Sequence, residues 1–292
     1  MLLRTFLRET EFGKWLTTPA FISRQHTWMN AGHRLLDPRM YNPLPKGLCA
    51  FAVMTKVPRA GQVKTRLTPP LTAQEAAALN ICFLRDTTAA IASIIRQELA
   101  RGIAVYTPVG AEEAYDAILP DEFELLPQRG GAFGERLAFA TEDLLALGFE
   151  SVCLIDSDSP TVPPRAFSQA AQILAEQKDA IVLGPSDDGG YYLIGLKKLH
   201  GALFKNIQWS TERVLEQTIE RAREIGLEVH FLPAWYDIDN DETLHRLCRE
   251  LFTGDGAASD AYPAPVTREY LKELLRGEGR ERIWPNDSLE TW

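Results

Sequence analysis

Residues 47–67 read GLCAFAVMTKVPRAGQVKTRL, an apolar run at 48–54 followed by a polar loop. In the next segment, residues 72–102, apolar positions recur every three or four residues, which predicts a helix. Thr72 and Glu75 have the spacing of a capping box at its start, and Gly102 supplies its stop. A strand, a loop and a helix in this order form the first unit of an α/β fold.

The same alternation continues along the chain. Further strands are expected at 103–107, 123–126, 151–155, 180–184, 191–196 and 227–232, and further helices at 111–119, before Gly148, at 164–177 and at 211–225. Alternating strands and helices predict a single mixed, mostly parallel sheet with helices on both faces. We therefore expect an α/β domain at 48–252, an N-terminal extension at 1–47, and a linker with one C-terminal helix at 253–292.

Composition excludes several classes of protein. The 31 Lys and Arg against 40 Asp and Glu give a net charge of −9, which argues against nucleic acid as the partner. No stretch resembles the roughly 20 apolar residues of a membrane span, and Arg4, Arg8 and Glu9 interrupt any signal-peptide pattern. The 4 cysteines form no CxxC pair and are interpreted as buried thiols. We expect a cytoplasmic protein with small-molecule partners. The sequence leaves open whether it forms a homodimer.

The loop after the first strand is basic. Residues 56–67 contain no acidic residue and carry Lys56, Arg59, Lys64 and Arg66. This loop predicts a local anion site, and Gly61 permits close approach of the backbone to a ligand. A solvated surface loop is the alternative. A phosphate-binding loop of the kinase type is excluded, because Val63 stands where that motif needs glycine.

Two acidic loops also follow predicted strands. Asp156 and Asp158 come directly after the strand at 151–155, and Asp237 and Asp239 lie in WYDIDND at 235–241. Ligands of open α/β sheets bind beyond the carboxyl ends of the strands, and paired carboxylates suit Mg²⁺ or Mn²⁺. For each loop taken alone, the alternative is that its aspartates only form turns or cap the following helix. Together with the basic loop, they predict a metal that faces a phosphate chain.

Two glycine-containing turns complete the pattern. In GPSDDGGYYLIGL, residues 184–196, Asp188 precedes Gly189 and Gly190, and Tyr191 begins a strand. A hairpin turn explains the glycines but not the carboxylates. In PQRGGAFGERL, residues 127–137, Gln128 could read a nucleobase edge. The GGAFG sequence does not fit GxGxxG, which disfavours a dinucleotide-binding Rossmann site.

Five ordered motifs carry a resemblance to a known family. They are TKVPRAGQVKTRL, LIDSDSPTVP, LGPSDDGGYYLIGL, WST and YDIDN, and they span about residues 48–250. The chain resembles CofC-like bacterial proteins catalogued as glycosyltransferases of the GT-A type. It is similar, more distantly, to 2-phospholactate guanylyltransferases and other nucleotidyltransferases. The resemblance implies a nucleotide-diphospho-sugar transferase fold with a nucleotide half and an acceptor half.

The resemblance also implies roles for individual residues. Lys64 and Arg66 would contact phosphates, Asp158 would be the main metal ligand, and Asp239 the opposing one. Asp188 would act near the sugar or acceptor. Further binding residues would be Lys56, Gly61, Thr65, Gln128, Gly130, Gly189, Gly190 and Tyr191. Asp156 departs from the family pattern, in which glycine is expected, so Asp156 and Asp237 are additional candidates for the metal.

Three functions remain open. The first is a metal-dependent glycosyltransferase that uses a nucleotide-diphospho-sugar. The second is a nucleotidyltransferase that transfers from a nucleoside triphosphate to a small phosphorylated acceptor and releases pyrophosphate. The third, of another class, is a nucleotide-binding module without catalysis, although carboxylates in three loops argue against a pure binder.

Overall fold

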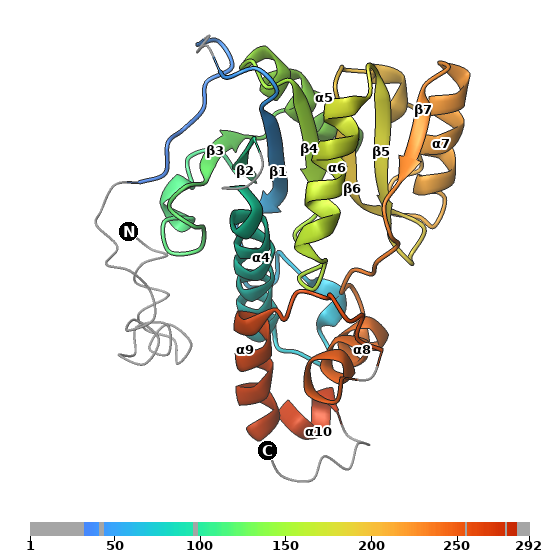
Figure 1. Cartoon of the computed structure of the whole chain (residues 1–292). Coiled ribbons are helices and arrows are strands. Elements are labelled where there is room, and N and C mark those ends of the chain that lie inside the picture. Colours follow the sequence, from blue (N-terminus) through green and yellow to red (C-terminus); the bar gives the residue numbers. More distant parts are fainter. Residues whose placement is uncertain (1–31, 41–43, 96–98, 255, 278, 285–292) are drawn as a thin grey trace.

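The computed structural model describes residues 32–40, 44–95, 99–254, 256–277 and 279–284 (Figure 1). Its centre is a 7-stranded sheet in the order β3-β2-β1-β4-β6-β5-β7. The strands are β1 (Cys49–Lys56), β2 (Ala100–Thr107), β3 (Glu124–Pro127), β4 (Ser151–Ile155), β5 (Ala180–Pro185), β6 (Tyr191–Leu196) and β7 (Glu228–Phe231). The residues of β1 to β6 are mostly buried and apolar and match the runs from which strands were predicted, whereas β7 at the sheet edge is partly exposed.

Strand pairing confirms a mixed, mostly parallel sheet. β1 pairs in parallel with β2 and β4, β2 with β3, and β5 with β7. β6 is antiparallel to both β4 and β5. The loops that follow β1, β2, β3, β4, β5 and β7 therefore open on one edge, where β6 begins.

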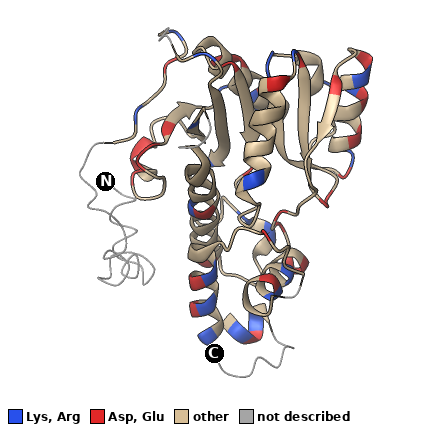
Figure 2. Cartoon of the chain, viewed as in Figure 1, with Lys and Arg blue, Asp and Glu red and all other residues tan. Residues whose placement is uncertain are grey.

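Helices cover both faces of the sheet. The described helices are α4 (Ala73–Ile95), α5 (Phe133–Ala146), α6 (Pro164–Glu176), α7 (Val214–Glu224), α8 (Asp241–Phe252), α9 (Pro265–Arg276) and α10 (Gly279–Ile283), with the short 3₁₀ helices η1 (Thr65–Leu67), η2 (Glu112–Ala114) and η3 (Gly201–Phe204). Phe51 of β1 packs with Ile91 of α4 and Phe167 of α6. On the other face, Ala52 packs in a cluster with Leu144 of α5 and Ala222 of α7. Figure 2 shows the strands nearly free of charge, with Lys, Arg, Asp and Glu on the surrounding helices and loops.

The first helix begins where the sequence predicts and ends earlier. The Thr72 N–H donates to Glu75 Oε2 over 2.7 Å, and the Glu75 N–H donates to Thr72 Oγ1 over 3.2 Å, which confirms the capping box. The predicted stop at Gly102 is wrong, because α4 ends at Ile95 and Gly102 lies within β2. A Cβ at Gly102 would lie 2.5 Å from the Phe123 ring, so close packing requires this glycine.

The C-terminal helices form a third cluster with α4. Phe83 of α4 packs with Leu247 of α8, Leu271 of α9 and Ile283 of α10. The predicted single helix after the linker is thus two helices, α9 and α10. Asp86 of α4, fully buried, accepts the main-chain N–H of Thr267 over 2.7 Å and so caps α9.

Part of the N-terminal extension lies against the sheet. Leu36 is buried, and its N–H donates to the Leu125 carbonyl of β3 over 2.8 Å. The Leu125 N–H donates in turn to the Arg34 carbonyl over 2.9 Å. These two bonds cover the edge of β3. Residues 1–31 lie outside the described part of the chain.

One helix corrects an expectation about membranes. Of the described helices, α4 alone is long and apolar enough to cross a bilayer, so the expectation that no stretch reaches this length and composition is wrong. Within its most apolar window, 72% of the helix is buried inside the fold. Such burial is what a core helix shows. The 4 cysteines are buried free thiols, as predicted.

Candidate functional site

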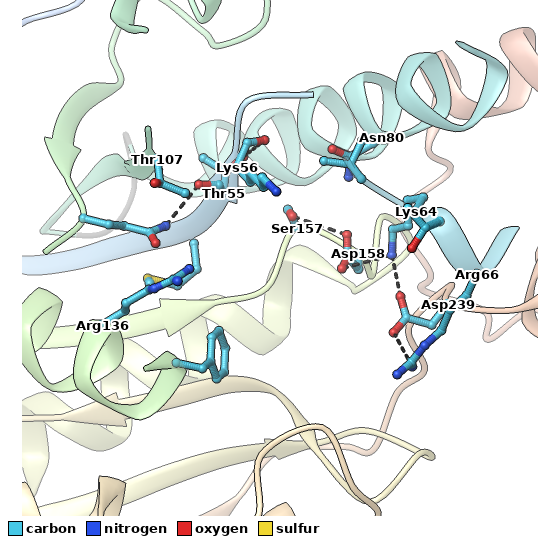
Figure 3. A pocket seen from close by; sticks show the side chains of 15 residues that line it. Thr55, Lys56, Lys64, Arg66, Asn80, Thr107, Arg136, Ser157, Asp158 and Asp239 are labelled. Carbon is cyan, nitrogen blue, oxygen red and sulfur yellow. Dashed lines mark hydrogen bonds and ion pairs between the residues drawn. The ribbon is translucent and has the colours of Figure 1, made fainter. Parts of the chain in front are cut away.

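A cavity of about 330 Å³ opens at the loop edge of the sheet. Figure 3 shows the side chains that line it, which come from β1 and the loop after it, from the end of β2, from α4 and α5, and from the loops after β3, β4 and β7. Seen there, Lys64, Asp158 and Asp239 lie at one side, and Lys56, Thr107 and Arg136 at the other. The predicted residues that line it are Lys56, Lys64, Thr65, Arg66, Gln128, Asp158 and Asp239.

The basic loop is fixed at both ends by buried apolar residues. Val57 is buried and its N–H donates to the Thr107 carbonyl, while Leu67 is fully buried in the cluster with α4 and α8. Between them, Lys64 adopts a left-handed backbone conformation with φ 48° just before η1. Apolar burial at the loop's ends thus holds the cationic residues at the cavity.

The Lys64 ammonium joins the two acidic loops. Its Nζ lies 3.0 Å from Asp158 Oδ2 and 2.8 Å from Asp239 Oδ1, and it donates to the Ile238 carbonyl over 2.7 Å. The Lys64 side chain is only 4% exposed, against 33% for Asp158 and 39% for Asp239. Arg66 approaches Asp239 more loosely, at 3.6 Å. The three residues predicted to form the centre of the site are therefore in direct contact.

Main-chain bonds hold the two acidic loops together. The Ile238 N–H donates to the Asp158 carbonyl over 3.0 Å. Ile238 is fully buried, and Asn240 caps α8 by accepting the Thr243 N–H. The Asp239 N–H donates to Thr243 Oγ1 over 3.0 Å, so the start of α8 also fixes Asp239.

The carboxylates perturb the titration of Lys64. Burial alone would lower the pKa of Lys64, but Asp158 and Asp239 outweigh it and the pKa is raised. For Asp239, burial acts to raise the pKa, and the Lys64 charge overcomes this and lowers it. The cluster is accordingly charged, with one ammonium between two carboxylates.

Asp156 and Asp237 have different surroundings. Asp156 accepts the Ser159 hydroxyl over 2.9 Å, and burial, together with the nearby Asp158, raises its pKa well above the usual value. Asp237 accepts the Ser186 hydroxyl over 2.9 Å. Burial, then Asp188 and Asp239, raise the pKa of Asp237 to about 6. Neither residue lines the cavity, although each precedes by two positions a residue that does, Asp158 or Asp239.

Gln128 is locked by the sheet. Its Nε2 donates to the main-chain carbonyls of Thr55 and Val105, over 3.0 and 2.7 Å. Both amide hydrogens are thereby used, because carbonyl oxygens can only accept. The free Oε1 gives the cavity a hydrogen-bond acceptor in a fixed orientation.

The turn at 186–190 lies beside the cavity rather than in its lining. Asp188 is exposed, and its Oδ1 accepts the Gly190 N–H over 2.8 Å. Gly189 has φ 86°, and a Cβ there would lie 2.1 Å from the Glu212 carbonyl oxygen, so chain packing explains this glycine. Tyr191 packs into the cluster on the α5 and α7 face. The turn is held next to the acidic loop at 235–241 by two hydrogen bonds, from the Ser186 hydroxyl to Asp237 and from the Asp187 N–H to the Trp235 carbonyl.

Two further predicted glycines also lie outside the cavity lining. Gly61 has φ 72° with nothing near its missing Cβ. Gly130 has φ 97°, and a Cβ there would lie 2.9 Å from the Phe139 ring. Both glycines shape turns next to the site.

Sequence reasoning missed several cavity residues. Arg136 and Phe133 reach it from the first turns of α5, and Asn80 from α4. Arg136 donates to the Gly131 carbonyl over 2.9 Å. Asn80 could have been found as a polar residue in an otherwise apolar stretch of predicted helix. Arg136 could have been found because it belongs to the glycine-containing segment at 127–137.

Asp158 and Asp239 are the carboxylates of the cavity that could bind a divalent ion. Among the described residues, no group of three or more His, Cys, Asp or Glu is arranged to hold a metal. Asp158 and Asp239 do converge, and each has a second oxygen besides the one on Lys64. Mg²⁺ commonly takes one or two carboxylates together with substrate phosphates. The residues therefore fit an ion that shares its ligands with a bound phosphate, rather than one held by protein alone.

Comparison with known proteins finds a solved structure of similar fold. A crystal structure from Desulfovibrio desulfuricans G20, described as a candidate nucleotide-diphospho-sugar transferase, aligns with TM-score 0.66 and 29% identity. The alignment covers 78% of this chain and 96% of that one. No match was found among curated proteins.

Two other solved structures are more distant. 4-Diphosphocytidyl-2C-methyl-D-erythritol synthase from Anaerococcus prevotii DSM 20548 aligns with TM-score 0.44 and 12% identity, over 77% of this chain and 97% of that one. Inositol-1-phosphate CTP transferase from T. maritima aligns with TM-score 0.43 and 17% identity, over 72% and 97%. Both similarities are too weak to bear on activity.

A family model matches part of the sheet. Residues 90–211 match the family described as "Uncharacterized protein conserved in bacteria (DUF2064)". This segment includes β4 with Asp158 and the turn at 186–190. With the mixed sheet and the structural match, the fold expected from the resemblance is confirmed: the chain is similar in fold to a candidate nucleotide-diphospho-sugar transferase, and the DUF2064 match lies at its centre.

Proposed function

We propose that the chain is a transferase that uses a nucleotide-activated donor, and that the donor is a nucleotide-diphospho-sugar. The observation that carries the proposal is the convergence of Lys64, Asp158 and Asp239 in a cavity that Lys56, Arg66 and Arg136 also line. Cationic side chains beside paired carboxylates suit a diphosphate with a divalent ion. The similarity to the Desulfovibrio desulfuricans protein supports this choice of donor.

The base and the metal would occupy different ends of the cavity, with the phosphates between them. Gln128 offers its fixed Oε1 to an N–H of a base, and the exposed Phe133 offers a ring for stacking. Lys56, Arg66 and Arg136 neutralise the phosphates. Asp158 and Asp239 would hold a Mg²⁺ or Mn²⁺, which when bound stabilises charge on the departing diphosphate.

The acceptor would enter beside the turn at 186–190. Asp188 lies close enough to Asp237 there for its charge to raise the pKa of Asp237. A pKa of about 6 suits Asp237 to accept a proton near neutral pH. We propose that this pair of carboxylates removes the proton from the attacking hydroxyl, with Asp188, the more exposed, nearer the acceptor.

One observation favours a second candidate. Three cations, Lys56, Arg66 and Arg136, line the cavity in addition to Lys64, which is more positive charge than a diphosphate needs. A nucleoside triphosphate would use this charge, with an acceptor phosphate attacking the α-phosphorus in line and pyrophosphate leaving.

Product analysis distinguishes the two chemistries. A thermal-shift panel of nucleoside triphosphates and sugar nucleotides, with and without Mn²⁺, first identifies donors, because a ligand of the native state raises its stability. Turnover of those donors is then measured with a panel of acceptor alcohols and phosphates. Release of a nucleoside diphosphate supports the proposal, and release of pyrophosphate supports the second candidate.

Binding without any turnover would instead indicate a nucleotide-binding module. The same would follow if Asp158→Asn and Asp239→Asn left turnover unchanged. Asp37→Asn is the matched control, since Asp37 forms an exposed ion pair with Arg39 away from the cavity.

A further inference from the structure

Lys64 has no hydrogen left for a phosphate. Its ammonium has three N–H donors, and its three close oxygen partners are Asp158 Oδ2, Asp239 Oδ1 and the Ile238 carbonyl, at 3.0, 2.8 and 2.7 Å. The side chain is 4% exposed. These contacts also stabilise a left-handed backbone that residues other than glycine rarely adopt.

The ammonium stands between the two carboxylates that would hold a divalent ion. A divalent ion between Asp158 and Asp239 would lie next to the Lys64 ammonium, which already neutralises both carboxylates and repels a second cation at this range. The remaining cations of the cavity are placed differently. Lys56 donates to the Gln62 carbonyl over 3.3 Å and Arg136 to the Gly131 carbonyl, so both keep donors for a ligand.

We propose that Lys64 acts as an internal counterion that keeps divalent metal out of the ligand-free site, and that the phosphates of the donor release it as the metal enters. The proposal rests on the proposed function, from which the metal and the phosphorylated donor are taken. On release, the ammonium exchanges carboxylate oxygens for phosphate oxygens and the metal takes its place. Metal binding is then coupled to donor binding, and without a donor the metal binds only weakly.

Mn²⁺ binding to the ligand-free protein tests the proposal. The free Mn²⁺ signal in electron paramagnetic resonance is followed during titration of wild type, Lys64→Met and Lys64→Gln. Both variants are expected to bind Mn²⁺ about tenfold or more tightly than wild type, within the usual range of coupling between sites. Lys56→Met removes the same charge from the same cavity without touching a carboxylate, and is expected to bind like wild type.

A second measurement needs no substitution. Wild-type protein is treated briefly with acetic anhydride with and without saturating Mn²⁺, and acetylation of each lysine is read by mass spectrometry. Lys64 is expected to be protected without metal and to become reactive when Mn²⁺ displaces it. Unchanged acetylation of Lys64 while the resonance signal shows Mn²⁺ bound would overturn the proposal.

The remaining outcomes separate this proposal from the proposed function. Equal Mn²⁺ affinity of wild type, Lys64→Met and Lys64→Gln, with all proteins folded by thermal melting, refutes the counterion role and leaves a metal-dependent transferase standing. No Mn²⁺ binding to any of them, even with a donor present, refutes both.

Discussion

The main-chain N–H of Ile238 donates to the carbonyl of Asp158 over 3.0 Å, although the two residues lie on different loops. This bond holds the loop after β4 against the segment that leads into α8. Asp158 and Asp239 consequently share the Lys64 ammonium. The acidic pair is thus built by the backbone and would persist when single side chains are changed.

Loss of either carboxylate should abolish most turnover. Asp158→Asn and Asp239→Asn keep the side-chain shape and remove the charge that would hold a metal. Each should reduce the rate by on the order of 10²-fold, comparable to loss of a main electrostatic stabiliser. Product formation from the donor found by thermal shift is the measurement. Asp37→Asn should match wild type, and a rate within twofold of wild type for both variants would contradict their assignment.

Arg136→Ala should weaken donor binding. Arg136 reaches the cavity from α5, and its guanidinium donates to the neutral Gly131 carbonyl, so its charge is available to a phosphate. Removing a charge-assisted bond of about 1.5–3 kcal/mol should raise the dissociation constant by about tenfold or more. Calorimetric titration with the donor measures this. Arg213→Ala serves as control, because Arg213 pairs with Glu216 on α7 outside the cavity lining. Equal affinity of the two variants would argue against a role for Arg136.

Asp86 should make stability fall as pH rises. Burial raises the pKa of Asp86 from 3.8 to about 6, so the folded state holds this proton more tightly than the unfolded state does. The resulting stabilisation is full below about pH 4 and is lost as pH rises through about 6, a change of about 2–3 kcal/mol.

Urea unfolding at pH 4 and pH 7 checks this change. Asparagine does not titrate, so Asp86→Asn should lose this contribution. The unfolding free energy at pH 7 minus that at pH 4 should therefore be larger in Asp86→Asn than in wild type by about 2–3 kcal/mol. The same pH dependence in both proteins would contradict the raised pKa. A lower stability of the variant at both pH values is expected as well, since Asp86 caps α9 with both oxygens.

Gly134→Ala should destabilise the protein although it lies in a helix. Alanine is normally the better helix residue by about 1 kcal/mol. Here its Cβ would lie 2.6 Å from the Phe204 carbonyl oxygen and 2.6 Å from Trp209 Nε1. Overpacking of this kind costs about 1–3 kcal/mol, so the net effect should be a loss. Thermal melting measures it, with Gly201→Ala, which has open space at its Cβ, as the neutral control. A higher melting temperature for Gly134→Ala would refute the clash.

Much of the fold could be predicted because its signals are local. The capping box of Thr72 and Glu75 and the apolar runs of the strands depend on neighbours in the chain. Gly102 misled the prediction, because glycine is used there for contact with Phe123 rather than as a helix stop. Contacts of that kind are invisible to any local pattern.

The site, like the fold, has features that the sequence predicts and features that depend on tertiary contacts. By itself the sequence determined that a basic loop and two acidic loops meet at one edge, because parallel strands send their carboxyl ends to the same side. Only the tertiary structure decided that the Lys64 ammonium lies between Asp158 and Asp239, that Gln128 presents its oxygen, and that Arg136 and Asn80 join the cavity. The physical reason is that side-chain direction and ion pairing depend on segments far apart in the chain, which are fixed only when the core packs.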